Sequence, residues 1–224
     1  MAESTQASLQ PSTTGDHVIG SETIANYLRR LSSREPTPGG GAAGAIHAAQ
    51  AAALIGMVAR YSTGAKFAAH EQDSAQIQAA ADAHLQAAMQ LAEADAAAFG
   101  GVIDAYKLPK DTAEKSAHRT RAIQEALLAA ATPPRKLVVL AHDIVNLGER
   151  LTDFGNPNVI SDVAAAAEAA RAAAATARVN IEINLTGITD PDRVEILQAS
   201  VWAADEAIQA AEALSDRVRK QILS

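Results

Sequence analysis

Asp95 is the residue of this sequence best suited to acid–base chemistry. It lies in the segment EADAAAF, and Leu91 and Phe99 lie four positions to either side of it, so the three side chains share one face of a helix. Burial of this apolar face would disfavour the charged carboxylate and raise its pKa toward the range useful for proton transfer. The alternative is a solvated aspartate, like the neighbouring Glu93, because carboxylates are seldom buried without a partner. Asp95 is therefore a candidate general acid or base that needs support from other segments.

A glycine-rich segment, PTPGGG at residues 36–41, leads into an alanine-rich helix. Backbone amides at a helix start are unpaired donors at the positive end of the helix dipole, so they attract anions. The segment lacks the Lys-Ser/Thr pair of a nucleotide P-loop, and no strand precedes it, which argues against a nucleotide phosphate as the ligand. A flexible turn is the alternative.

The segment GNPNVISD presents two amides, a hydroxyl and a carboxylate around a turn and a helix start, from Asn156, Asn158, Ser161 and Asp162. The helix dipole keeps a carboxylate ionised there, so we expect Asp162 to accept hydrogen bonds rather than donate a proton. The asparagine amides offer both donors and acceptors, which suits recognition of a heterocycle. Helix capping and turn formation are the alternative roles of these residues.

The charged residues outside these segments indicate an anionic ligand more than a metal. Basic side chains lie near the predicted helix ends, at Lys66, Lys107, Lys110, Arg119 and Arg121, although solvation is the alternative for each. None of the six histidines follows a glutamate by three positions, and no HExxH motif occurs, so we expect no metal site.

The composition excludes several classes of protein. With no cysteine there is neither a disulfide framework nor a thiolate nucleophile, which fits a cytoplasmic setting. The net charge of −7 argues against a nucleic-acid partner. The apolar run 42–59 contains His47 and Gln50 and consists largely of Ala and Gly, so we expect a buried helix rather than a membrane span.

The elements that must position these residues are helices. The apolar fraction is 48%, yet only seven residues are aromatic, so a core of this kind requires helices that approach closely through alanine. We expect an all-α fold, an antiparallel bundle of long Ala-rich helices in a single domain at 21–224, after a disordered tail at 1–20. We expect a first helix that Ser21 caps and that closes before Pro36, and an Ala-rich second helix that begins after Gly41 and runs to about residue 61. The further expected helices run from roughly 67 to 106, from 111 to about 131, onward to about 152, from 161 to about 177, and from 190 to about 222. Residues 179–185, VNIEINL, alternate like a strand, and we expect them to form the helix end and an extended connection.

The order and spacing of five segments resemble the cyclodeaminase/cyclohydrolase family: PTPGGG, GMVARYSTGAKF, EADAAAFGGVIDAYKLPKDTAEKSAHRTRAIQEAL, GNPNVISD and NIEINLTGITD. This helical domain forms the C-terminal part of formiminotransferase-cyclodeaminase and also occurs as stand-alone methenyltetrahydrofolate cyclohydrolases. The resemblance extends over nearly everything from Ser21 onward. One departure is visible, because Gly64-Ala65-Lys66 leaves one cation where the family commonly has two adjacent basic residues.

The resemblance implies hydrolysis of 5,10-methenyltetrahydrofolate to 10-formyltetrahydrofolate, by a homodimer that needs no cofactor beyond its folate substrate. It implies that Asp95 moves the proton with Lys66 near it. The substrate-binding residues that it implies are Pro38, Gly39, Gly40, Gly41, Tyr61, Lys107, Lys110, Asn156, Asn158, Ser161 and Asp162. Two alternatives stay open: a formimidoyltetrahydrofolate cyclodeaminase that releases ammonia, and a non-catalytic folate-binding helical module. The scarcity of aromatic residues further implies that pterin recognition relies on loops, amides and carboxylates more than on an aromatic stack.

Overall fold

The computed structural model describes residues 18–224, and these residues form helices without any strand. Seven α-helices and two short 3-10 helices follow one another. Their bounds are η1 Ile19–Ser21, α1 Ile24–Leu31, α2 Gly40–Tyr61, η2 Ala65–His70, α3 Glu71–Lys107, α4 Ala113–Ala130, α5 Thr132–Phe154, α6 Ser161–Leu185 and α7 Pro191–Leu223. The predicted all-α fold is therefore confirmed.

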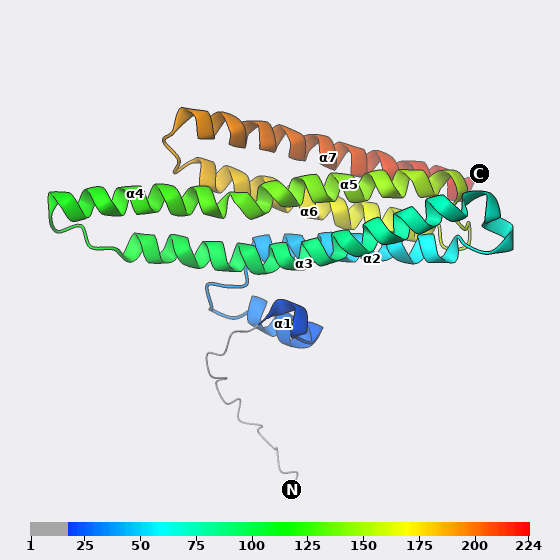
Figure 1. Ribbon diagram of the computed structural model, residues 1–224, viewed down its shortest axis with the longest axis horizontal. Coiled ribbons are helices and arrows are strands. Elements are labelled where there is room, and N and C mark those ends of the chain that lie inside the picture. The colour runs from blue at the N-terminus through cyan, green and yellow to red at the C-terminus, as the bar shows by residue number, and fades with distance from the viewer. Residues whose placement is uncertain (1–17) are drawn as a thin grey trace, which may run out of the picture.

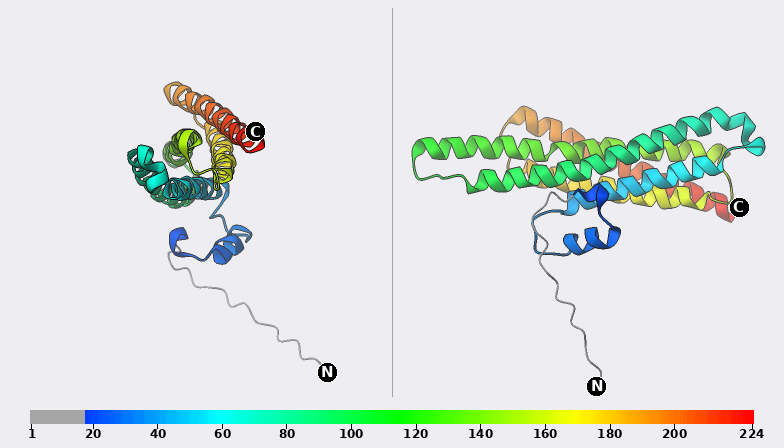
Figure 2. Two further views of the ribbon diagram at one scale, coloured as in Figure 1. Left: turned by 90° about the vertical axis from the view of Figure 1, so that its right-hand side faces the viewer. Right: turned by 60° about the horizontal axis from the view of Figure 1, so that its bottom comes forward.

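The long helices lie side by side in an elongated antiparallel bundle (Figure 1). Helix α2 packs against α3, α5 and α6, while α7 covers the outer side of α5 and α6 (Figure 2). The hairpin of α3 and α4 extends past the ends of the other helices, and α4 continues almost straight into α5 (Figure 1). Helix α1 lies to one side of the bundle, near the start of α2.

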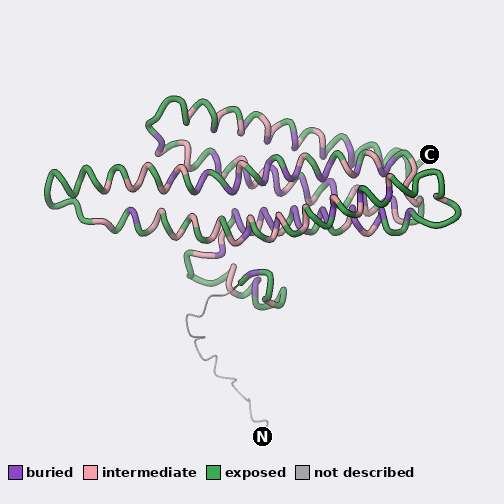
Figure 3. Tube along the Cα trace, in the orientation of Figure 1, coloured by how far each residue is buried: buried purple, intermediate pink, exposed green. Residues whose placement is uncertain are grey.

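Small residues form most of the core, as the composition predicts. The buried residues of α2 and α6 are mainly alanine and glycine, and they gather where these two helices meet in the middle of the bundle (Figure 3). A Cβ at Gly44 of α2 would lie 2.9 Å from Cγ2 of Thr176 on α6, so the two backbones approach more closely than larger side chains would permit. Although α2 is long and apolar enough to cross a membrane, most of it is buried inside this bundle.

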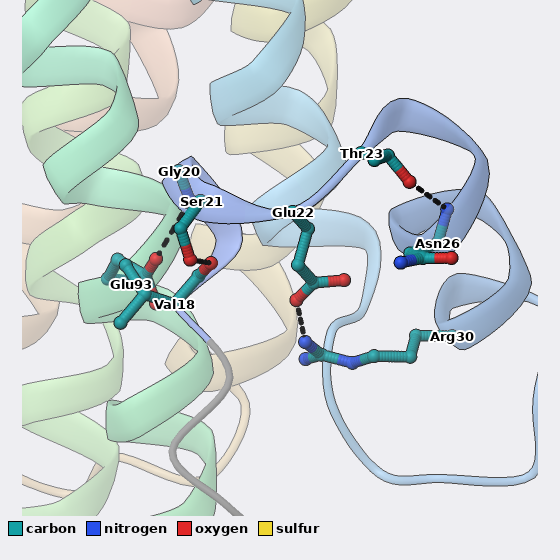
Figure 4. A network of polar contacts seen from close by, with 8 residues as sticks. All are labelled: Val18, Gly20, Ser21, Glu22, Thr23, Asn26, Arg30 and Glu93. Carbon is teal, nitrogen blue, oxygen red and sulfur yellow. Dashed lines mark hydrogen bonds and ion pairs between the residues drawn. The ribbon is translucent and has the colours of Figure 1, made fainter. Parts of the chain in front are cut away.

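The segment before α1 is attached to α3, and α1 is attached to that segment (Figure 4). The backbone N–H of Gly20 donates to Glu93 at 3.4 Å, and Arg30 of α1 forms an ion pair with the buried Glu22. Ile19 is only 5% exposed, so ordered structure begins inside the predicted tail; residues 1–17 lie outside the described residues.

Some predicted helix starts differ from the structure. The cap of α1 is Thr23 rather than Ser21, because its hydroxyl accepts the N–H of Asn26 at 3.2 Å while the Ser21 hydroxyl donates to a carbonyl. Helix α4 is capped by Thr112, one residue after the expected Asp111. At α6 the cap position is Ile160, which makes no side-chain capping bond. Ser, Thr and Asp are all good caps, and several stand next to each other in these segments.

The prediction of an extended connection at residues 179–185 is wrong, because α6 continues to Leu185. Ile181 is fully buried, and the side-chain amides of Asn180 and Asn184 donate to the carbonyls of Thr176 and Asn180, one turn earlier. Alternation of polar and apolar residues over seven positions is compatible with a helix when the side chains four positions apart share an environment.

Candidate active site

The carboxylate of Asp95 lies directly against the first turn of α2. All three carboxyl atoms occupy the space that a Cβ of Gly41 would need, so a larger residue at position 41 would displace the carboxylate. A Cβ at Gly40, by contrast, would have no heavy atom within 4 Å. The glycine-rich segment and the predicted acid–base residue, which are far apart in the sequence, are therefore parts of one site.

Burial raises the pKa of Asp95 above its ordinary value of 3.8, and a hydrogen bond from the backbone N–H of Ala42 partly opposes this rise. Both effects come from the same contact: α2 removes water from the carboxylate and also presents its unpaired first-turn amides to it. A carboxylate of this kind accepts a proton more readily than a solvated one and returns it to a leaving group.

A pocket of about 410 Å³ opens next to Asp95. Its walls come from the segment before α2, from the middle and end of α3, from the end of α4 and from the end of α6 with the turn after it. The lining residues are Pro36, Thr37, Gly39, Gly40, Gly41, Asp95, Phe99, Val102, Tyr106, Leu127, Ala130, Asn180, Ile183, Asn184, Thr186 and Gly187. Its size suits a small organic ligand, and Asp95 is the only carboxylate among these residues.

The formiminotransferase-cyclodeaminase family model matches residues 23–203, which include every element that forms this pocket. The chain belongs to this family. It is 37% identical over 174 residues to the methenyltetrahydrofolate cyclohydrolase of Methylorubrum extorquens, an alignment that covers 77% of this chain and 84% of that enzyme. It is 34% identical over 170 residues to the formimidoyltransferase-cyclodeaminase of Rattus norvegicus, of which it spans 31%.

The fold also matches a solved structure. The crystal structure of formiminotetrahydrofolate cyclodeaminase from Thermotoga maritima superposes with a TM-score of 0.78 at 29% identity, over 91% of this chain and 97% of that one. The all-helical bundle is thus the fold of a formiminotransferase-cyclodeaminase family member over nearly the whole chain.

Two amides of this family member face the pocket from α6, and neither is among the residues predicted from the sequence. Asn180 and Asn184 each donate through Nδ2 to a carbonyl one turn earlier, at 2.9 and 2.8 Å. This leaves the Oδ1 atoms as acceptors for a ligand N–H. Their spacing of four positions in NIEIN is the signal that could have identified them, but the same residues also alternate like a strand.

Aromatic residues contribute more to the pocket than expected, because Phe99 and Tyr106 both line it. They are about half-exposed, and Ile183, which also lines the pocket, is 65% exposed. Arg119 of α4 donates to the backbone carbonyl of Tyr106. Its guanidinium also lies 5.5 Å from the centre of the Tyr106 ring, in a cation–π contact. The expectation that pterin recognition relies on loops, amides and carboxylates more than on an aromatic stack stays a prediction.

Tyr27 of α1 is a further buried polar residue close to the site. It is 8% exposed and its hydroxyl has no hydrogen-bond partner among the described residues. Burial raises its pKa; Arg30 opposes the rise, whereas the charges of Glu22 and Asp95 add to it. The phenol therefore stays protonated, as a neutral donor near the acid–base carboxylate.

Other predicted residues lie beside the pocket or beyond it. Pro38 is buried next to the lining residue Gly39, after a cis Thr37–Pro38 peptide bond. Lys107 and Lys110 are exposed at the tip of the α3–α4 hairpin, where Lys107 contacts Asp104 at 2.9 Å. Neither lysine lines the pocket.

A second group of predicted residues lies at the opposite end of α2, about 30 Å from Gly41 by the rise of a 22-residue helix. Asn156 connects this group, since its side-chain amide donates to the carbonyl of Tyr61 and its backbone N–H donates to Ser62, both at 2.9 Å. Its Oδ1 accepts the N–H of Asn158 at 3.1 Å. The group comprises Tyr61, Lys66, Asn156, Asn158, Ser161 and Asp162. One chain therefore does not bring Lys66 to Asp95.

The described residues do not offer a metal centre, because no three His, Asp or Glu side chains of residues 18–224 come together. The pocket combines one carboxylate, two amide oxygens, helix-start amides and aromatic walls, a set suited to binding a heterocycle and moving a proton.

The raised pKa of Asp95 predicts how its replacement changes stability with pH. Because the folded-state pKa lies above the unfolded value, ionisation of Asp95 favours the unfolded chain, so the wild type loses stability as pH rises through the folded pKa. We expect Asp95→Asn to raise the melting temperature at pH 8, and this advantage to disappear below about pH 4. Thermal unfolding at both pH values measures it, with Asp82→Asn as a control on the same helix that should gain no stability at pH 8, because Asp82 is exposed and pairs with Arg60 at 2.6 Å. An Asp95→Asn protein that melts below the wild type at pH 8 would contradict a raised pKa.

Proposed function

We propose that this protein is a cytoplasmic methenyltetrahydrofolate cyclohydrolase that converts 5,10-methenyltetrahydrofolate to 10-formyltetrahydrofolate without a further cofactor. The observation that carries the proposal is the single half-buried carboxylate, Asp95, held against glycine amides in a pocket that fits a pterin. The similarity to the Methylorubrum extorquens cyclohydrolase, over 84% of that enzyme, supports this choice within the family.

Hydrolysis of methenyltetrahydrofolate requires only acid–base catalysis. In the substrate a cationic amidinium carbon links two nitrogens. Water adds to this carbon as Asp95 takes one of its protons, which forms the C–O bond and a neutral tetrahedral adduct. Asp95 then gives the proton to the departing N5 as the C–N5 bond breaks, and the second proton of the water is released when the formyl group on N10 forms. The raised pKa suits Asp95 to both transfers.

Other groups of the pocket are suited to binding the pterin and to stabilising charge during the reaction. The Asn180 and Asn184 oxygens can accept pterin N–H groups, while Phe99 and Tyr106 offer apolar surface to the rings. The carboxylate attracts the cationic substrate. The amides of Gly40 and Gly41, at the positive end of α2, are placed to stabilise negative charge that develops on the oxygen as the adduct loses its second proton.

A second candidate activity is formimidoyltetrahydrofolate cyclodeaminase, because the Thermotoga maritima structure and the Rattus norvegicus relative carry that name. There an amine nitrogen attacks, ammonia leaves, and the methenyl ring closes. The same carboxylate would protonate the leaving nitrogen.

A paired assay separates these activities. We expect the purified protein to accelerate the loss of methenyltetrahydrofolate absorbance well above the uncatalysed rate, and to release little ammonia from 5-formimidoyltetrahydrofolate. Ammonia release at the faster rate would favour the cyclodeaminase. Tight folate binding without turnover in either assay would contradict both and support a non-catalytic binding module.

We also propose that the protein works as a homodimer. The predicted site residues form two groups at opposite ends of one bundle, around Asp95 and around Lys66. An antiparallel, twofold-related copy is the simplest arrangement that would bring the second group of one chain to the pocket of the other.

Mixed dimers test this arrangement. We expect Asp95→Asn and Lys66→Ala each to be nearly inactive as homodimers. A heterodimer of the two, isolated with two different tags, should recover about half of the wild-type kcat, because one of its two sites is intact. A monomer at assay concentration, an inactive heterodimer or an active Lys66→Ala homodimer would contradict the shared site.

A further inference from the structure

Two adjacent glycines, Gly100 and Gly101, lie inside helix α3 shortly before its end. Glycine is among the least favourable residues in a helix interior, because it loses the most backbone freedom on folding. Close packing accounts for other glycines of the bundle, such as Gly41 and Gly44, where a Cβ would collide with a neighbouring side chain. At Gly100 and Gly101, by contrast, a Cβ would meet no heavy atom of another described segment within 4 Å. Packing within the described chain therefore does not require these two glycines.

The helix that runs back from α3 has a weak point as well, at the junction of α4 with α5. The hydrogen-bond pattern of an α-helix needs an N–H at every position, and Pro133 and Pro134 at the start of α5 have none. The next backbone bond, from the N–H of Arg135 to the carbonyl of Ala131, is long at 3.4 Å. The two helices continue almost straight, yet the backbone hydrogen bonds across their junction are interrupted (Figure 1).

Both weak points lie beside the candidate active-site pocket. Phe99 and Val102, on either side of the glycines, line the pocket, and so do Leu127 and Ala130 in the last turn of α4. The chain between the weak points, residues 102–130, forms a hairpin arm that extends past the ends of the other helices (Figure 1).

Few side chains of the hairpin arm are buried. In its α3 part the buried residue is Ala105, and in α4 the buried residues lie in the last turn, at the base of the arm. Gln124 attaches the arm to the α6–α7 loop, since its side chain donates to the carbonyl of Gly187 at 2.7 Å and accepts the N–H of Thr189 at 3.0 Å. A movement of the arm therefore exposes little apolar surface, and water can replace these hydrogen bonds.

The residues of the pocket belong to two bodies, the bundle and the hairpin arm. Asp95, Asn180 and Asn184 lie on the bundle, whereas Val102 and Tyr106 lie on the arm. Tyr106 is 51% exposed, so its ring has room to move. A rotation of the arm about the two weak points therefore changes the distance between this aromatic side chain and the carboxylate while both helices stay folded.

We propose that Gly100–Gly101 and the α4–α5 junction form a double hinge, and that the hairpin arm is a lid that closes over a folate in the Asp95 pocket. The identity of the ligand rests on the proposed function, whereas the hinge does not. Helices bend most readily at glycine pairs and at proline. Closure brings Tyr106 onto the pterin and removes bulk water from around Asp95, which strengthens its attraction for the cationic substrate. Opening releases the product.

Replacement of both glycines by alanine tests the hinge. In Gly100→Ala/Gly101→Ala the new Cβ atoms have free space, and alanine favours the straight helix, so we expect the melting temperature to rise by about 4–8 °C. The kcat with methenyltetrahydrofolate should fall by about fivefold to tenfold, because the lid bends less readily and the product leaves more slowly. A protein that is more stable and yet slower has lost motion rather than structure.

Thr120→Ala is the matched control, because Thr120 is an exposed α4 residue of the arm, away from both hinges. It should also raise the melting temperature slightly, while kcat stays at the wild-type value. An unchanged kcat in the glycine variant would overturn the proposal. A lower melting temperature or an altered oligomeric state in analytical ultracentrifugation would overturn it as well, because the glycines would then serve packing or a contact between copies.

Spin labels measure the motion itself. The chain has no cysteine, so Glu114→Cys on the arm and Gln209→Cys on α7 place one label on each body, both at exposed positions. Dilution with unlabelled protein removes distances between copies. We expect electron–electron double resonance to give a broad distance distribution for the free protein, and a narrower, shifted one with 5-formyltetrahydrofolate. With Gly100→Ala/Gly101→Ala added, the distribution should be narrow without ligand and should shift little.

The two proposals fail in different ways. If the wild type turns over neither methenyl- nor formimidoyltetrahydrofolate, the proposed function fails, while a narrower distribution in the ligand-free glycine variant than in the ligand-free wild type still supports the hinge. Equal widths in these two proteins overturn the hinge. Normal turnover without any shift on binding of 5-formyltetrahydrofolate overturns the lid.

Discussion

The close approach of Asp95 to the first turn of α2 is the contact on which the candidate site depends. It is possible because Gly41 has no Cβ in the space that the carboxylate fills, and because the buried faces of α2 and its neighbours are made of small residues. The same approach removes water from the carboxylate and raises its pKa. The alanine-rich composition, which favours close helix packing, is in this way also a condition for the acid–base chemistry.

The helices around this contact each contribute a different kind of group to the pocket. Helix α2 supplies amides, α3 the carboxylate and the aromatic wall, and α6 the two asparagine oxygens. The end of α4 completes the pocket through the apolar side chains of Leu127 and Ala130.

The helical fold and the separate candidacies of Asp95 and the glycine segment follow from local sequence patterns, whereas the contact between the two is a finding of the structure. An apolar helix face around one aspartate and unpaired amides after GGG are visible without coordinates. The grouping of residues in space is not. Tyr61, Lys66 and Asn156 fall at the far end of α2 because a helix of 22 residues is about 30 Å long, which motif order alone does not reveal. Asn180 and Asn184 escape prediction because seven alternating residues fit both a strand and the end of a helix.

The kinetics of Asp95→Asn test the account most directly. The substitution keeps the shape of the side chain and an acceptor for the Ala42 amide, but it cannot take up or return a proton. With methenyltetrahydrofolate as substrate, the account predicts that kcat falls by about 100-fold or more, while KM changes little and Asp82→Asn behaves as the wild type. Near-normal kcat with only a raised KM would show that Asp95 binds the substrate without moving the proton.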